Sequence, residues 1–308
     1  MCRAGILEHH AGHLRAVLVA QAAGRRRRIP RQGPLILLPP GFPPDVEVVA
    51  TDLDRTLISD DYVLRPRTLA ALRRAQEAGV RVIVCTGRMV QSAQRVLEPA
   101  GLSGPLVCYQ GAAIVDPDGT WIFHAPIELG LAREAIEAVE AAGFGLNVYV
   151  DDELYVAEVT PEAERYSTFQ RIPLHVVGDL GSWLERPPTK LVCIGDPAAL
   201  DELGVKMRER FAGRLYVTKS LPFFLEFATE GVSKSSALAF LARRFGFAEE
   251  RTITIGDGEN DLDLVAWGYG VAVENADERV KAVAQWVCPP VSEEGVAHLL
   301  EALLDSRR

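Results

Sequence analysis

The stretch that decides the fold is residues 48–57, which read VVATDLDRTL. An apolar run ends abruptly in two aspartates, Asp52 and Asp54, with Leu53 between them. Such a run is typical of a buried strand in a parallel sheet, and ligands bind outside the carboxyl ends of these strands. Because side chains alternate along a strand, both carboxylates should lie on one side, where their repulsion calls for a divalent cation. An acidic strand-end turn is the alternative that this stretch alone leaves open.

The composition indicates a globular protein of about two domains. The chain has 308 residues, of which 48% are hydrophobic, enough for a sizeable core. It contains no run of about 18 apolar residues, so we expect no membrane span. Three of its five cysteines, Cys85, Cys108 and Cys193, lie in apolar runs without metal-like spacing. We therefore expect reduced core cysteines and a cytoplasmic location, with the chain a monomer or small homo-oligomer.

The net charge of −9 is unevenly distributed. Residues 1–45 hold seven arginines against Glu8 and Asp45, a balance of +5, so the remainder carries −14. An acidic body argues against nucleic acid as the main partner. The first 45 residues also contain a run of four arginines and a proline-rich tract, so we expect a disordered leader. A targeting arm or a polyanion-binding arm is the alternative interpretation of this segment.

From residue 46 onward, apolar strands alternate with amphipathic helices. We expect strands over 48–51, 80–85 and 106–109 and helices over 66–78 and 88–97. This alternation predicts an α/β fold with a parallel sheet and right-handed crossovers. Residues 117–226 are richer in strands, including a hairpin around Asp151-Asp152-Glu153, and predict an inserted α+β domain. The alternation returns over 227–308, so residues 46–116 and 227–308 should form one interrupted core domain.

Four polar clusters fall where chemistry is expected, each after an apolar strand or at the start of a helix. They are Asp52 with Asp54, the run Thr86-Gly87-Arg88, Lys234, and Asp257 with Asn260 and Asp261. Carboxylates from two strands can hold Mg²⁺, and one of them can attack phosphorus while its neighbour transfers protons. A hydroxyl and an ammonium can bind the remaining phosphate oxygens. The set therefore indicates phosphoryl transfer.

These four clusters resemble the motifs of the haloacid dehalogenase superfamily, and more narrowly those of Cof-type phosphatases with a large α+β cap. The resemblance covers residue 46 to the C-terminus, and the 148 positions between Thr86 and Lys234 (234 − 86) leave room for the cap. It implies a Rossmann-like parallel core. Three positions depart from the usual pattern: Arg55 and Glu274 stand where Gly is common, and Gln110 where Asn is common. We expect Arg55 to point to solvent; if it faces the mouth of the site instead, it adds positive charge there. We expect Gln110 to hydrogen-bond near Asp52.

The resemblance also implies a role for each residue. The catalytic pair would be Asp52, the nucleophile, and Asp54, the general acid and base. The other residues would bind phosphate (Thr86, Gly87, Lys234, Asn260), bind Mg²⁺ (Asp52, the Asp54 backbone carbonyl, Asp257) or support the site (Asp261). The expected activity is Mg²⁺-dependent hydrolysis of small phosphorylated metabolites, such as sugar phosphates or a phosphorylated cofactor, through an aspartyl phosphate.

Two alternatives remain open at this stage. A phosphomutase acting on phosphosugars would use the same motifs and return the phosphoryl group to its substrate. A non-catalytic module that binds a phosphorylated ligand would keep the fold without turnover, although a pure binder would not need Asp54. The sequence contains nothing that identifies the substrate, because selectivity is expected in the inserted domain.

Overall fold

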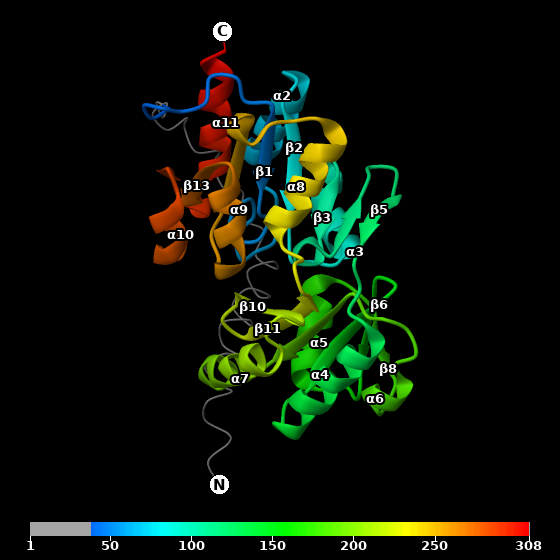
Figure 1. Ribbon diagram of the computed structural model, residues 1–308. Helices are drawn as coiled ribbons and strands as arrows, with labels where there is room; N and C mark the ends of the chain where they lie inside the picture. Colours follow the sequence, from blue (N-terminus) through cyan, green and yellow to red (C-terminus); the bar gives the residue numbers. More distant parts are fainter. Residues whose placement is uncertain (1–37, 308) are drawn as a thin grey trace, which may run out of the picture.

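The computed structural model describes residues 38–307, which form two lobes, each built around one sheet (Figure 1). Most of the predicted leader lies outside the described residues. Its end packs on the body, because the Phe42 ring lies 5.1 Å from that of Tyr269 and 6.3 Å from that of Trp286. No helix among residues 38–307 is long and apolar enough to cross a membrane.

The large lobe contains an eight-stranded sheet, which is parallel except at one edge. Its strands, in spatial order, are β14 (Trp286–Cys288), β13 (Tyr269–Val273), β12 (Thr252–Gly256), β1 (Val48–Thr51), β2 (Arg81–Cys85), β3 (Leu106–Cys108), β4 (Ala113–Val115) and β5 (Trp121–His124). β1 is fully buried at the centre, and its Val49 pairs with Ile253 of β12 and Val82 of β2. The predicted α/β fold with a parallel core is confirmed.

Helices cover both faces of this sheet. They are α2 (Pro66–Glu77), α3 (Val90–Leu97), α8 (Lys234–Phe245), α9 (Leu262–Trp267), α10 (Glu278–Val283) and α11 (Gly295–Asp305). Alternate residues of β1 enter different clusters: Val49 packs with α2, α3 and α11, whereas Val48 and Ala50 pack with α8. Since both faces of β1 are covered, its run of apolar residues is continuous.

The small lobe contains a six-stranded sheet, ordered β10 (Leu215–Leu221), β11 (Phe224–Thr229), β9 (Lys190–Ile194), β6 (Leu146–Val150), β7 (Glu153–Val156) and β8 (Leu174–Val176). Its helices are α4 (Leu129–Ala141), α5 (Pro161–Gln170), α6 (Leu180–Trp183) and α7 (Pro197–Arg210). Apolar residues of α4, α6 and α7 fill one face of the sheet. On the other face, Tyr149, Val192 and Phe224 join the apolar cluster of the large lobe.

The structure changes three details of the predicted layout. β5 lies within the expected insertion of 117–226, yet it pairs with β4 in the large sheet, because the turn at residues 116–119 closes a hairpin there. α3 begins at Val90, since the residues after β2 form a loop before the helix. α5 was not predicted at all. Cys85, Cys108 and Cys193 are buried and free of disulfides, as expected.

Candidate active site

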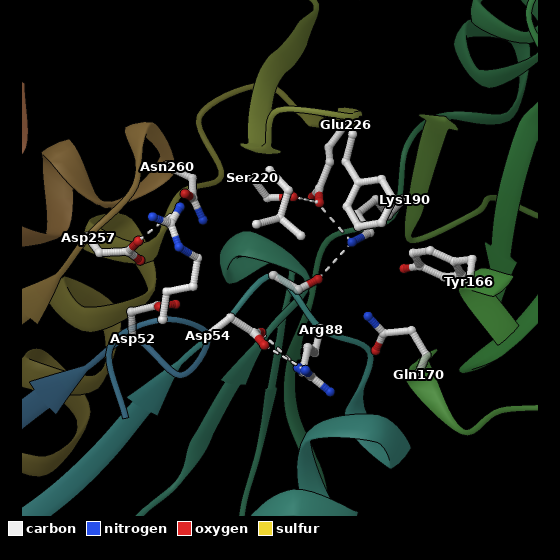
Figure 2. A pocket seen from close by; sticks show the side chains of 14 residues that line it. Asp52, Asp54, Arg88, Tyr166, Gln170, Lys190, Ser220, Glu226, Asp257 and Asn260 are labelled. Atoms are coloured by element: carbon white, nitrogen blue, oxygen red, sulfur yellow. Dashed lines mark hydrogen bonds and ion pairs between the residues drawn. The ribbon is translucent and has the colours of Figure 1, made fainter. Parts of the chain in front are cut away.

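The candidate site lies where β1, β2 and β12 end together, facing the small lobe (Figure 2). Asp52 follows β1, Gly87 follows β2 and Asp257 follows β12, and all three line one cavity between the lobes. The Asp52 backbone N–H donates to the Ile255 carbonyl at 2.8 Å, which continues the pairing of β1 with β12 past the strand end. The sheet itself therefore brings together residues that are about 200 positions apart in the chain.

A buried ammonium group joins two of the carboxylates. Lys234 opens α8 and is 1% exposed. Its Nζ donates to Asp52 Oδ1 at 2.6 Å and to Asp261 Oδ1 at 2.5 Å. Asp52 Oδ2 accepts no hydrogen bond from any residue that the structure describes. One oxygen of Asp52 is thus held in place while the other is left for chemistry.

Asp261 is committed to structure on both oxygens. Its Oδ2 accepts from the backbone N–H groups of Asp257 and Gly258, each at 3.0 Å, and its Oδ1 accepts from Lys234. The Asp261 side chain also lies against Gly256, where an added Cβ would stand 2.4 Å from the Asp261 Cβ. The backbone at this point can therefore approach Asp261 only with glycine at position 256.

Burial and mutual repulsion define the electrostatics of this cluster. The pKa of Asp52 is raised well above its ordinary value, mainly by burial and then by Asp261, while Lys234 opposes the shift. Burial, followed by Asp261, raises the pKa of Asp257 to about 7. Burial lowers the pKa of Lys234, but Asp261 and Asp52 outweigh it and hold this pKa above its usual range. The cluster is therefore short of positive charge.

The donor set fits a hard divalent cation. Asp52, Asp257 and Asp261 each offer an oxygen within 4.8 Å of the others, and no histidine or cysteine belongs to this group. Oxygen donors of this kind suit Mg²⁺. Since both Asp261 oxygens already have partners, Asp52 and Asp257 are the carboxylates available to an ion. Arg55 and Thr56 contact Asp257 only loosely, at 3.5 and 3.4 Å.

Asp54 is held from the side by Arg88. Arg88 Nε donates to Asp54 Oδ2 at 2.7 Å and Nη2 donates to Oδ1 at 2.6 Å, a two-bond arrangement typical of strong carboxylate recognition. The Arg88 backbone N–H also donates to Thr86 Oγ at 3.1 Å. Thr86 itself is fully buried, so Gly87 and Arg88 form the cavity wall at this loop.

The small lobe reaches into the site through Lys190 and Glu226, which the sequence did not single out. Lys190 Nζ donates to the Gly87 carbonyl at 2.7 Å and to Glu226 Oε2 at 3.2 Å. Gln110 Nε2 donates to the same Glu226 oxygen at 3.1 Å, and Asn260 Nδ2 donates to Gln110 Oε1 at 3.1 Å. One chain of hydrogen bonds thus joins three loops of the large lobe through two buried residues of the small lobe.

Of the two interpretations of Arg55, the structure matches the one that places it at the mouth of the site. Arg55 lines the cavity and lies 3.5 Å from Asp257, because its backbone turns at φ 61° beside the strand end. Gln110 hydrogen-bonds Glu226 and Asn260, which line the same cavity as Asp52, in keeping with the expected bond near Asp52.

The acidic hairpin tip also has a partner in the large lobe. The Asp152 carboxylate accepts from the Val90 and Gln91 backbone N–H groups at 2.8 and 2.9 Å, and from the Tyr109 hydroxyl at 2.6 Å. It therefore caps the start of α3 from the other lobe. Burial raises the pKa of this carboxyl above its ordinary value. The hairpin tip is a junction between the lobes.

Comparison with known proteins places this geometry in context. The family model described as haloacid dehalogenase-like hydrolase matches residues 49–300. Phosphatase YwpJ of Bacillus subtilis is 27% identical over 287 residues, an alignment that covers 84% of this chain and 100% of the relative. The HMP-PP phosphatase of Serratia proteamaculans is 28% identical over 268 residues, with coverage of 84% and 96%. A crystal structure from Thermotoga maritima shares 30% identity and a TM-score of 0.71, with coverage of 83% and 97%.

Proposed function

The chain belongs to the haloacid dehalogenase-like hydrolases and is a phosphatase, and we propose that it hydrolyses small phosphorylated metabolites with Mg²⁺. The proposed intermediate is an aspartyl phosphate on Asp52. The observation that carries the proposal is the asymmetry of Asp52. Lys234 holds Oδ1, while Oδ2 lacks a partner among the described residues and the side chain borders the cavity. A carboxylate fixed in this way keeps one oxygen available to attack phosphorus.

The first half-reaction forms the phosphoenzyme. Asp52 Oδ2 forms a bond to phosphorus as the bond from phosphorus to the substrate oxygen breaks, and Asp54 supplies the proton that this oxygen takes up. In the second half-reaction Asp54 removes a proton from water, whose oxygen attacks phosphorus and frees Asp52 and inorganic phosphate. Arg88 donates to both oxygens of Asp54, so it positions this carboxyl for the two proton transfers.

The remaining residues bind charge. Asp52 and Asp257 would hold Mg²⁺, with the Asp54 backbone carbonyl as a further ligand, and the ion would neutralise the phosphoryl oxygens as their charge develops. Lys234, whose pKa Asp261 and Asp52 hold above its usual range, would add a positive charge close to Asp52. Gly87 and Asn260, which line the cavity, would contact the phosphate oxygens once substrate enters. Thr86 is fully buried and would reach them only if the loop after β2 shifts. The proposed cellular location is the cytoplasm.

Phosphate release from a panel of phosphate monoesters tests the proposal. Activity should require Mg²⁺ and disappear in excess chelator, and Asp52→Asn should abolish it while leaving the melting temperature close to that of the wild type. Turnover by Asp52→Asn near the wild-type rate would mean that another residue attacks phosphorus.

A further inference from the structure

The small lobe forms the wall of the cavity that lies opposite the carboxylates. This wall consists of Tyr166, Gln170, Lys190, Ser220, Leu221, Phe224 and Glu226. If phosphorus sits beside Asp52, as the proposed function requires, the leaving group must project toward this wall. The chemistry of the wall therefore indicates the chemistry of the leaving group.

The wall carries no net formal charge. Lys190 and Glu226 are its charged residues, and they pair with each other at 3.2 Å with side chains only 2% and 5% exposed. Lys190 is also committed to the Gly87 carbonyl, and Glu226 accepts from Gln110 and Ser220 as well. A second phosphate or a carboxylate on the leaving group would lose its hydration beside Glu226 without gaining an uncommitted cation from this lobe.

One polar group of the wall is left for a ligand. Gln170 is 6% exposed, and its amide points into the cavity (Figure 2). Arg88 donates to Ser92 Oγ at 3.2 Å, and Ser92 Oγ donates in turn to Gln170 Oε1 at 2.5 Å. This sequence of donors leaves Gln170 Nε2 facing the cavity, with no acceptor for it among residues 38–307. Because Nε2 faces the cavity and no described residue accepts from it, an acceptor on a bound ligand can take its hydrogen bond.

The rest of the wall is largely apolar and includes two aromatic rings. Tyr166 and Phe224 meet edge to face, with ring centroids 5.2 Å apart, and Leu221 lines the same cavity. Aromatic walls of this kind favour flat groups, which stack or pack edge to face against them.

We propose that the preferred substrate is a phosphate monoester of an uncharged alcohol that carries a heteroaromatic ring, with a ring nitrogen or carbonyl that accepts from Gln170 Nε2. The inference rests on the proposed function and narrows it. It separates such esters from bisphosphates and phosphorylated acids, whose second anion the small lobe does not bind. It also separates them from phosphosugars, which carry no aromatic ring to cover the aromatic wall.

Two matched substrate pairs test the inference on the wild-type protein. We expect kcat/KM for adenosine monophosphate to exceed that for ribose phosphorylated at the same oxygen by about tenfold. This factor corresponds to the free energy of one aromatic contact. We expect a hexose phosphate to be hydrolysed at least about tenfold more efficiently than the corresponding phosphorylated aldonic acid, which differs by one carboxylate. Equal or reversed preference in both pairs would overturn the inference.

A substitution separates the role of Gln170 from a merely structural one. Gln170→Leu should raise KM for adenosine monophosphate about tenfold more than KM for phenyl phosphate, whose ring offers no acceptor. Gln94→Leu, at an exposed position of α3, is the matched control and should change neither. Equal losses on both esters in folded Gln170→Leu would overturn the inference and leave the proposed function intact. Failure of the wild type to hydrolyse any ester, phenyl phosphate included, would instead overturn the proposed function.

Discussion

Replacing Lys234 by methionine should destabilise the protein far more than the loss of an ordinary lysine. The substitution keeps the length of the side chain but removes the ammonium that lies 2.6 Å from Asp52 and 2.5 Å from Asp261. Breaking a buried ion pair costs about 3–5 kcal/mol, because the surviving charge stays buried without compensation. Here two carboxylates lose the same partner, so we expect the upper part of this range and a fall in melting temperature of roughly 10 °C.

The matched control is Lys219→Met. Lys219 Nζ also lies 2.6 Å from a carboxylate, that of Asp201, but this aspartate is 67% exposed. Surface pairs of this kind contribute about 0–1 kcal/mol. Thermal unfolding of both variants in chelator, where no ion can replace the ammonium, measures the difference directly. Equal melting temperatures for the two variants would refute the argument that Lys234 compensates the buried carboxylates.

Three further predictions follow from particular contacts. Arg88→Met should lower kcat/KM for phenyl phosphate roughly 10- to 100-fold, because hydrogen bonds to a charged group contribute about 1.5–3 kcal/mol. Arg88→Lys should not restore kcat/KM, because lysine lacks the planar guanidinium that bonds both carboxylate oxygens. Asp152→Asn should lower the free energy of unfolding in urea by about 0.5–2 kcal/mol, since an amide nitrogen would face the N–H groups that start α3; an unchanged midpoint would contradict this. Burial and Arg67 lower the pKa of His298 below 6.5 in the folded protein. As the pH drops below 6.5, the unfolded chain takes up a proton at this residue more readily than the folded one, so the free energy of unfolding should fall. His298→Gln should flatten that part of the stability curve, and an identical slope in variant and wild type would contradict the assignment.

The parallel sheet could be predicted because its strands carry local signals. The run that ends in Asp52 is apolar and short, and the polar residues that follow β2 and β12 come at the strand ends that a parallel sheet brings together. Ser233 before α8 is a hydroxyl N-cap that marks where Lys234 enters the site. Local pattern and spacing were sufficient for these elements.

The contribution of the small lobe could not be predicted in the same way. Lys190 and Glu226 stand in apolar strands, and only the pairing of β9 with β11 shows that both face the large lobe. Gln170 lies at the end of α5, a helix with no clear apolar stripe, although Thr160 followed by Pro161 was a usable signal for its start. Distant pairing and the approach of one lobe to the other decide these positions.

Trapping the phosphoenzyme tests the central claim most directly. The Asp54→Asn variant is mixed with an activated phosphate ester and Mg²⁺ and quenched in acid within one turnover. Protein that carries one phosphoryl group should accumulate. Attack by Asp52 needs no acid when the leaving group is good, whereas hydrolysis of the phosphoenzyme needs Asp54 as the base. Peptide mass spectrometry should locate that group on Asp52, and the double variant with Asp52→Asn should carry none. Phosphorylation of another residue would contradict the account, and so would phosphate release by the double variant at the rate of the Asp54→Asn variant.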